Sequence, residues 1–256
     1  MLNKKELTVI VPFYKKMDTF YKTFLSLKNQ SYKNFKTIIV YDDEEKKDLV
    51  KIKKIISNDK NFQIIINKKN IGAGYSRNKA LKKVDTKYVA FLDADDVWHK
   101  DKLKFQINLM KKKKFLMTFT SYNIIDDKNK IISKISSKNN LNYKEILKSC
   151  DIGLSTVMLN TQIIKNLKFG KTKTKEDYIL WLKLAKKTNF IGINKTLSSW
   201  RKSKNSLSSN TLQKVIDAFK VYFIYERYNF FISIIYTIRL SLNFLLKHYL
   251  NLNIRI

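Results

Sequence analysis

The segment Tyr88–Asp96, with sequence YVAFLDADD, has residue types and a spacing that could hold a metal ion. Asp93, Asp95 and Asp96 follow an apolar run with the length of a buried strand, so their carboxylates are held close together. Like charges this close raise one another's pKa unless a positive charge lies between them. A hard divalent cation, Mg²⁺ or Mn²⁺, suits such oxygen ligands and leaves room for substrate phosphates. The alternative is a strand that ends in a solvated acidic turn.

The elements that must position these carboxylates alternate between strands and helices. Apolar runs bounded by polar residues predict strands, and a 3.6-residue apolar period with capping residues predicts helices. The expected strands span residues 7–13, 35–41, 62–66, 87–92 and 115–120, and the expected helices span residues 18–30, 48–56, 74–83 and 99–113. This order predicts an α/β fold with a doubly wound, mostly parallel sheet.

Three polar features fall at the carboxyl ends of predicted strands, namely Tyr14, Asp43 and the acidic cluster at 93–96. In an open α/β sheet, ligands bind beyond these ends. Later in the chain we expect a helix at 141–149, a strand at 155–159, an amphipathic helix at 176–187 and a polar loop at 196–210. The sequence thus predicts one ligand site that is built from several strand ends.

The chain is strongly basic, with 52 Lys and Arg residues against 21 Asp and Glu residues and a formal net charge of +31 over 256 residues. Only five of the basic residues are Arg, and the lysines are spread along the whole chain. A nucleic-acid-binding domain more often carries Arg forks and a concentrated basic stripe, so we expect no nucleic-acid partner. The charge still predicts attraction to phosphates and to anionic lipid.

Two features bear on the compartment. The single cysteine, Cys150, cannot form an internal disulfide, which fits a reducing environment. Residues 1–6 lead directly into a strand pattern, so we expect no signal peptide. Together they predict a cytoplasmic protein.

The C-terminal segment differs in composition from the residues before it. Between Tyr228 and Leu246 the only charged residue is Arg239, and large apolar residues gather on one face of a predicted helix. We therefore expect a domain at 1–210 and an amphipathic helical segment at 211–256. The preferred interpretation is peripheral attachment to an anionic membrane surface, the inner face of the plasma membrane. Packing of the apolar face on a protein surface is the second interpretation, and a membrane span is the third.

Six segments, in order, resemble motifs of the family 2 glycosyltransferases of GT-A fold, over roughly residues 7–210. The first, Val9–Tyr14, is similar to the family's opening strand, whose end packs on the nucleotide base. The other five are Asp42-Asp43, Asn70–Asn78, Asp93-Ala94-Asp95, Glu176-Asp177, and Trp200-Arg201 through Ser208. The resemblance implies a nucleotide-diphospho-sugar transferase sheet of GT-A type with C-terminal helices.

The resemblance also implies roles for individual residues. Asp95 would be the direct metal ligand, and Asp177 would be the catalytic base that takes a proton from the acceptor hydroxyl. Contacts to the donor nucleotide would come from Pro12, Tyr14, Asp43, Arg77, Asp93 and Arg201. One base and direct displacement imply inversion at the anomeric carbon.

The implied activity is metal-dependent transfer of a sugar from a nucleotide-diphosphate donor, UDP-linked by the resemblance, to a hydroxyl of a cell-envelope or lipid-linked glycan. Three positions depart from the family: Glu44–Lys47 stands where it has Gly-Ser, Lys15 where it has Asn, and Ser203 where it has His. A catalytically silent scaffold of the same fold therefore stays open. Two further functions are weaker fits: a nucleotidyltransferase, whose usual Gly-rich loop residues 11–18 lack, and a basic nucleic-acid-binding protein.

Overall fold

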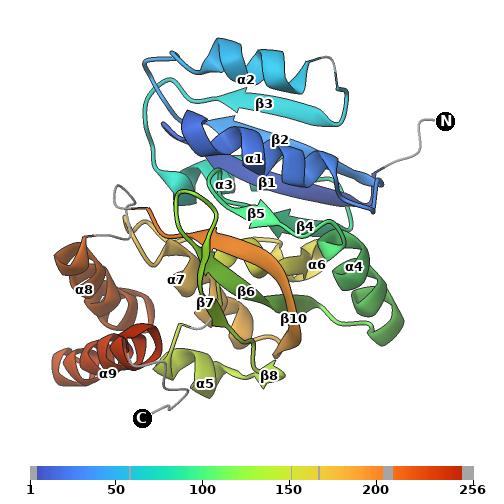
Figure 1. Cartoon of the computed structure of the whole chain (residues 1–256). Helices are drawn as coiled ribbons and strands as arrows, with labels where there is room; N and C mark the ends of the chain where they lie inside the picture. Colours follow the sequence, from blue (N-terminus) through green and yellow to red (C-terminus); the bar gives the residue numbers. More distant parts are fainter. Residues whose placement is uncertain (1–4, 58, 151, 167, 204–209, 250–256) are drawn as a thin grey trace.

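A mixed sheet of ten strands runs through the computed structural model, which describes residues 5–57, 59–150, 152–166, 168–203 and 210–249 (Figure 1). The strands are β1 (Leu7–Phe13), β2 (Phe35–Tyr41), β3 (Phe62–Ile66), β4 (Tyr88–Phe91), β5 (Val97–Trp98), β6 (Met117–Ile125), β7 (Ile131–Ile135), β8 (Asn140–Leu141), β9 (Met158–Asn160) and β10 (Phe190–Arg201). Their order is β3-β2-β1-β4-β9-β6-β10-β5, with β7 paired to β6 and β8 to β10. β3, β2, β1 and β4 are parallel, whereas β9 runs antiparallel between β4 and β6. The predicted α/β fold is confirmed.

Helices cover both faces of the parallel half of the sheet. They are α1 (Met17–Lys28), α2 (Leu49–Ile56), α3 (Ala73–Leu81) and α4 (Lys102–Lys113). Successive strand residues point to opposite faces, so Val9 and Val11 join the apolar cluster that includes α1, α2 and α4, whereas Ile10 joins the cluster that includes Ala80 of α3. Because both faces are covered, β1 and β2 are buried along nearly their whole length and read as continuous apolar runs in the sequence.

The predicted polar loop at 196–210 is wrong in its first part, because residues up to Arg201 belong to β10. This strand pairs with β6, β5 and β8, and the hydroxyl of Ser198 donates to the backbone carbonyl of Ser155 at 3.0 Å. Ser198 and Arg201 are buried with hydrogen-bond partners inside the protein, so the strand lacks the apolar pattern on which the sequence argument depends. Residues 204–209 of the predicted loop lie outside the described residues.

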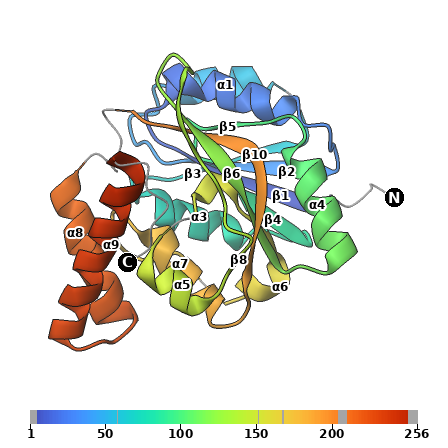
Figure 2. The ribbon, with the colours of Figure 1, turned by 60° about the horizontal axis from the view of Figure 1, so that its bottom comes forward.

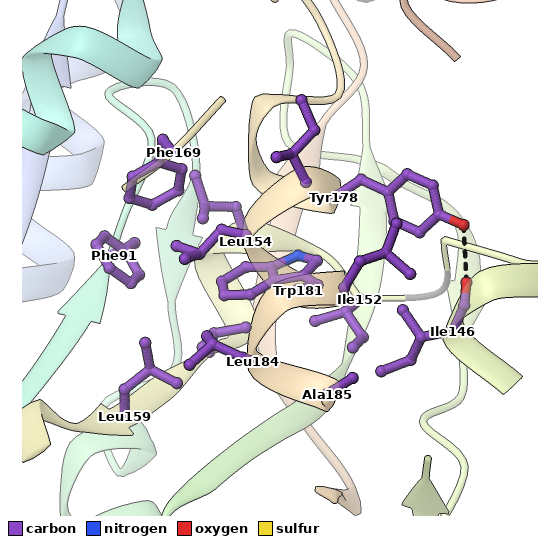
Figure 3. Close-up of a cluster of buried hydrophobic side chains, with 14 of the residues drawn as sticks. Phe91, Ile146, Ile152, Leu154, Leu159, Phe169, Tyr178, Trp181, Leu184 and Ala185 are labelled. Atoms are coloured by element: carbon purple, nitrogen blue, oxygen red, sulfur yellow. Dashed lines mark hydrogen bonds between the residues drawn. The ribbon is translucent and has the colours of Figure 1, made fainter. Parts of the chain in front are cut away.

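Between β8 and β10 the described residues form three α-helices, α5 (Tyr143–Lys148), α6 (Thr161–Ile164) and α7 (Glu176–Ala185). The predicted strand at 155–159 begins instead as a 3₁₀ turn, Leu154–Thr156, and continues as β9. Trp181 of α7 is fully buried and packs near Phe169 and Leu154 (Figure 3). Its ring lies 6.4 Å from that of Phe169 and 6.2 Å from that of Phe190, centroid to centroid. This packing fixes the position of α7 and hence of its first residues, Glu176 and Asp177.

In the described residues after β10, two α-helices lie side by side at one side of the molecule, next to α5 and α7 (Figures 1 and 2). They are α8 (Thr211–Lys220) and α9 (Phe230–Tyr249), joined through a π-helical turn (Val221–Tyr225). The predicted division into 1–210 and 211–256 stays a prediction. We propose that the two parts share one core, because the apolar cluster around Trp181 also contains Ala218, Val221, Tyr222 and Leu240.

Candidate active site

Hydrogen bonds and ion pairs bring the ends of β1, β2 and β4 together with the first turns of α3 and α7. Lys16, after β1, lies 2.9 Å from Asp95, after β4. Asp42, after β2, accepts a hydrogen bond from the backbone N–H of Gly72, just before α3. Arg77 of α3 contacts both Asp93 and Glu176. The strand ends that the sequence marks as a ligand site thus meet in one place.

The acidic turn after β4 is held rigidly through Asp96. This side chain is buried, and its carboxylate accepts hydrogen bonds from the hydroxyl of Ser155 at 2.6 Å and from the backbone N–H of Arg201 at 2.9 Å. The hydroxyl of Thr23 lies 2.9 and 2.8 Å from the backbone carbonyls of Ala94 and Asp96. Burial, together with the charges of its two neighbouring carboxylates, raises the pKa of Asp96 well above its ordinary value. Asp96 therefore braces the turn from inside.

Asp93 and Asp95 keep part of their carboxylates exposed, at 32% and 16% of their side-chain surface. Each already has a cation of the protein beside it: Arg77 lies 2.6 Å from Asp93, and Lys16 lies 2.9 Å from Asp95. Burial raises the pKa of Asp95, Lys16 lowers it, and the negative charge of Asp93 raises it again. The two carboxylates are thus the acidic pair of the turn that a ligand could reach.

Arg77 is the link between this turn and α7. Its guanidinium is buried, donates to Asp93 at 2.6 Å and to Glu176 at 2.7 Å, and lies 5.4 Å from the centroid of the Phe169 ring. Among the described residues, no hydrogen-bond partner reaches its Nε. A guanidinium that bridges two carboxylates fixes their separation, because its planar fork has a rigid geometry.

The carboxylates at the start of α7 are partly buried. Burial raises the pKa of Glu176 to about 7, which Arg77 opposes and the charge of Asp177 reinforces. Burial also raises the pKa of Asp177, although Arg77 and Lys175 lower it. The Oδ1 atom of Asp177 accepts a hydrogen bond from the backbone N–H of Tyr178 at 2.8 Å. A carboxylate with a raised pKa is a better proton acceptor near neutral pH.

The segment before α3 is ordered by Asp42, which is buried. Its carboxylate accepts hydrogen bonds from the backbone N–H groups of Ile71 at 2.9 Å and Gly72 at 2.8 Å, and from the amide of Asn67 at 2.8 Å. Gly72 has φ of +85°, a conformation that residues with a Cβ rarely adopt. These contacts set the start of α3 and therefore the position of Arg77.

Three residues expected to meet the donor base lie at the ends of β1 and β2. Tyr14 is 43% exposed, Pro12 is partly buried within β1, and Asp43 is buried. The carboxylate of Asp43 accepts a hydrogen bond from the backbone N–H of Glu45 at 3.2 Å. Their donor contacts stay predictions.

Arg201 has contacts that favour a positioning role over the predicted contact with the donor. It is 1% exposed, and its guanidinium donates to the backbone carbonyls of Asp95 at 2.9 Å and Asp126 at 2.6 Å and to the side chain of Asn129 at 2.6 Å. These three bonds tie the acidic turn to the 126–129 turn. The serines 206 and 208 of the same predicted motif lie outside the described residues.

The residues present fit a divalent cation that shares its coordination with a ligand. Within the described ranges, no group of three or more His, Cys, Asp or Glu side chains is arranged to enclose a metal. Asp93 and Asp95 offer two neighbouring carboxylates that are partly open, and Mg²⁺ typically takes one or two carboxylates together with substrate phosphates. Lys16 contacts Asp95 where such an ion would bind, so its ammonium would have to move aside.

The sequence argument missed Ser155 and Lys16. Ser155 accepts the backbone N–H of Asp93 at 3.1 Å and donates to Asp96, and its own carbonyl accepts the indole N–H of Trp98 at 2.7 Å. Its position in an apolar run that reads as a strand gives no sign of this role. Lys16 is one lysine among many in a basic chain, and only its place between β1 and α1 marks it.

Comparison with known proteins gives a family match over most of the sheet. A family model described as Glycosyl transferase family 2 matches residues 8–165. The chain is 32% identical over 210 residues to the Escherichia coli UDP-Glc:alpha-D-GlcNAc-diphosphoundecaprenol beta-1,3-glucosyltransferase WfgD, a match that covers 81% of each protein. It is 34% identical over 236 residues to the putative teichuronic acid biosynthesis glycosyltransferase TuaG of Bacillus subtilis strain 168, covering 90% of this chain and 92% of TuaG.

Solved structures share the fold at lower sequence identity. S. aureus TarS 1-349 in complex with UDP-GlcNAc has a TM-score of 0.71 and 18% identity, over 95% of this chain and 73% of that one. The mannosyltransferase PcManGT from Pyrobaculum calidifontis, in complex with GDP-Man and Mn²⁺, has a TM-score of 0.67 and 12% identity, over 93% of this chain and 70% of that one. These likenesses show the GT-A fold that the sequence predicts.

Proposed function

The chain belongs to glycosyltransferase family 2, and we propose that it transfers a sugar, with inversion at the anomeric carbon, from a nucleotide-diphosphate donor to a hydroxyl of a cell-envelope or lipid-linked glycan. Two relatives support the acceptor class, since WfgD is named for a diphosphoundecaprenol-linked sugar and TuaG for teichuronic acid biosynthesis. The name of WfgD contains UDP-Glc, and TarS is described with UDP-GlcNAc. We therefore propose a UDP-linked sugar as the donor.

Donor binding is assigned to the ends of β1 and β2. Tyr14, exposed at the end of β1, would stack on the nucleotide base, with Pro12 behind it as part of the wall. Asp43 would accept a hydrogen bond from the base, as a carboxylate acceptor does. Arg77 and Asp93 would contact the diphosphate and ribose side of the donor.

A divalent cation, Mg²⁺ or Mn²⁺, is assigned to Asp95 with Asp93 beside it. When bound, it would stabilise the negative charge that develops on the departing diphosphate. PcManGT is described with Mn²⁺, which supports a metal in a protein of this fold. Lys16 and Arg77 bring positive charge to the same two carboxylates.

Asp177 is the proposed general base for the acceptor hydroxyl. The observation that carries the proposal is the Arg77 bridge, which spans from Asp93 on the donor side at 2.6 Å to Glu176 at 2.7 Å, next to Asp177. A base must be held at a fixed position relative to the donor for direct displacement, and this bridge provides a rigid connection. Arg201 is assigned a positioning role for the acidic turn.

The reaction is proposed to take place at the cytoplasmic face of the plasma membrane. A nucleotide sugar is a water-soluble donor, and a lipid-linked acceptor presents its hydroxyl at the bilayer surface. The net charge of +31 supports attraction to an anionic leaflet.

The test is a thermal-shift panel of nucleotide sugars with and without Mn²⁺, followed by transfer of the stabilising donor's sugar to a polyprenol-diphosphate-linked acceptor. A bound donor raises the melting temperature by mass action, so one sugar nucleotide should stand out and should do so only with the metal. Turnover would then be measured as metal-dependent release of the nucleoside diphosphate. If donors bind but no acceptor yields product, the silent-scaffold interpretation is favoured.

A further inference from the structure

Helix α9 is amphipathic, but its main apolar face points away from the domain. A surface helix normally packs its apolar face on the protein. The side facing the domain is largely polar: Ser233, Thr237 and Asn243 are buried there together with Leu240. The amide of Asn243 donates to the backbone carbonyl of Lys148 at 2.9 Å. The opposite side is apolar and exposed at spacings of three and four residues, with exposed fractions of 76% at Phe231, 63% at Ile235, 54% at Ile238, 44% at Leu242 and 48% at Leu245. Most of the large apolar side chains of α9 thus face outward, Leu240 being an exception.

Helix α8 extends this exposed apolar surface. The rings of Phe219 and Phe230 lie 5.7 Å apart, centroid to centroid, so the end of α8 meets the start of α9. The two helices lie side by side in both views (Figures 1 and 2). Outward side chains from α8 and the turn after it are Leu212, Val215, Ile216, Phe223 and Ile224, each at least 40% exposed. We call the outward apolar residues of 212–245 the arm surface. Large apolar side chains exposed together on neighbouring helices usually mark an interface.

The charge around the arm surface selects an anionic bilayer as its partner. Residues 211–249 contain five basic side chains and two acidic ones, within a chain of net charge +31. The ammonium of Lys214 lies 5.1 Å from the centroid of the Phe244 ring, so a cation stands beside an apolar side chain of α9. A second copy of the chain would carry the same excess charge and would be repelled, whereas anionic headgroups attract it.

The shape of the arm surface fits a membrane interface. The exposed stripe of α9 from Phe231 to Leu245 is about 21 Å long at 1.5 Å per residue. In the part of the chain that the structure covers, no helix has the length and apolarity to cross a bilayer. A helix with one apolar face and cationic neighbours lies in the plane of the interface, with that face among the acyl chains.

We propose that the arm surface docks the enzyme on an anionic membrane and, resting on the proposed function, that docking presents the start of α7 to a lipid-linked acceptor. The inner side of α8 holds the segment before α7: Asp217 accepts hydrogen bonds from the backbone N–H of Thr174 at 2.9 Å and from its hydroxyl at 3.0 Å. The hydroxyls of Tyr222 and Tyr178 lie 3.0 Å apart. Helix α8 and the turn after it therefore carry outward apolar side chains and also contact α7 and the segment before it.

The test is sedimentation of the full chain with vesicles of phosphatidylglycerol and phosphatidylcholine. The Phe231→Ser/Ile235→Ser variant should bind at least about tenfold more weakly than the wild type, because two exposed apolar side chains are lost from the interface. The matched control is Val50→Ser/Ile132→Ser, which changes exposed apolar residues of α2 and β7 and should bind as the wild type does. High salt should weaken the wild-type association without abolishing it, since screening acts on the charges alone.

Two results would overturn the docking proposal. One is equal vesicle binding by the arm variant and the wild type at unchanged melting temperature. The other is a concentration-dependent dimer, seen by analytical ultracentrifugation, that the arm variant abolishes, because the surface would then belong to a second copy of the chain.

Donor binding and sugar transfer test the proposed function separately from vesicle binding. Donor-induced thermal shift should be equal in the wild type and the arm variant, and transfer to a lipid-linked acceptor in vesicles should fall with binding. If the wild type binds vesicles through the arm but transfers no sugar, docking stands and the proposed acceptor fails. If transfer is unchanged when vesicle binding is lost, the link between docking and acceptor presentation is wrong.

Discussion

Arg77 and Glu176 form an ion pair of 2.7 Å although 99 positions separate them in the sequence. The same buried guanidinium holds Asp93 at 2.6 Å, so one side chain joins α3, the acidic turn after β4 and the first turn of α7. Burial lowers the pKa of Arg77, but Asp93 and Glu176 outweigh it and raise the pKa above its ordinary value. The Arg77 guanidinium therefore stays positively charged, and the strength of its ion pairs depends on the ionisation of Asp93 and Glu176.

The first prediction concerns the pH dependence of this bridge. Because the pKa of Glu176 is about 7, the Arg77 ion pair is complete only above that pH. We expect kcat/KM to fall as the pH is lowered through about 7, and Glu176→Gln to lower activity while removing the inflection near 7. A pH profile of both proteins measures this. An unchanged inflection in the variant would assign the titration to another group.

Thermal unfolding gives an independent check of the same group. Its raised pKa means that the folded protein binds the Glu176 proton more tightly than the unfolded chain does. Its contribution to stability is therefore complete below about pH 4.5 and is lost as the pH rises through about 7. The melting temperature of the wild type should fall more between about pH 5 and about pH 8 than that of Glu176→Gln.

The second prediction tests the metal assignment. Asp95→Asn removes a charged ligand, so transfer should fall about 100-fold or more and Mn²⁺ should no longer enhance the donor-induced thermal shift. The fold should persist, because burial already disfavours the charged form of Asp95. Asp85→Asn, which changes a carboxylate that is 60% exposed and paired with Lys36, is the control. Full metal-dependent activity in the Asp95 variant would exclude the assignment.

The third prediction concerns the brace that the sequence did not reveal. Ser155→Ala leaves the buried carboxylate of Asp96 without its 2.6 Å hydrogen bond, which should cost about 1–3 kcal/mol of stability. Displacement of the acidic turn should also lower donor affinity. Calorimetric unfolding and donor titration measure the two effects. The control is Ser57→Ala, at an exposed position, and equal behaviour of the two variants would refute the brace.

The parts of the site that the sequence predicts are those set by local structure. The acidic turn and Asp43 follow apolar runs, and the carboxyl ends of such runs converge in any parallel sheet. Lys16, Ser155 and Arg201 take their roles from contacts across the fold, which a strand or helix pattern does not encode. Arg201 reads as a loop cation near the donor, but the tertiary structure places it beneath the acidic turn.

The orientation of the C-terminal helix α9 is also not encoded in its local sequence pattern. The sequence predicts an apolar and a polar face of α9, but a helical wheel does not say which of them meets the protein. In the structure Asn243 bonds to Lys148 and Leu240 joins the core, whereas Phe231 and Ile235 are exposed. The exposure of these side chains supports the proposed membrane docking over packing of the same face inside the protein.

The fourth prediction uses the close approach between α3 and α7. A Cβ at Gly74 would lie 2.9 Å from Cγ of Glu176 and 3.1 Å from the backbone oxygen of Gly170. Gly74→Ala should therefore push the start of α7 away from Arg77, lower stability by about 1–3 kcal/mol and reduce kcat at least about tenfold. Gly153→Ala is the matched control, because its Cβ would meet nothing closer than 3.4 Å. Unchanged turnover in Gly74→Ala would show that α7 can shift without effect on catalysis.

The last prediction separates the proposed base from the donor site. Asp177→Asn cannot accept the acceptor proton, so kcat should fall about 10²- to 10⁴-fold, whereas the donor dissociation constant should stay within a few-fold. Isothermal titration with the nucleotide sugar and Mn²⁺ measures the donor dissociation constant.

Asp177 also lies in the first turn of a helix, where a negative charge is stabilising by about 0.3–1 kcal/mol. Asp18→Asn, at an exposed first-turn position of α1, measures that effect without touching the site. Loss of donor affinity together with turnover would make Asp177 a donor-binding or structural residue, and Glu176 would then be the carboxylate to test as the base.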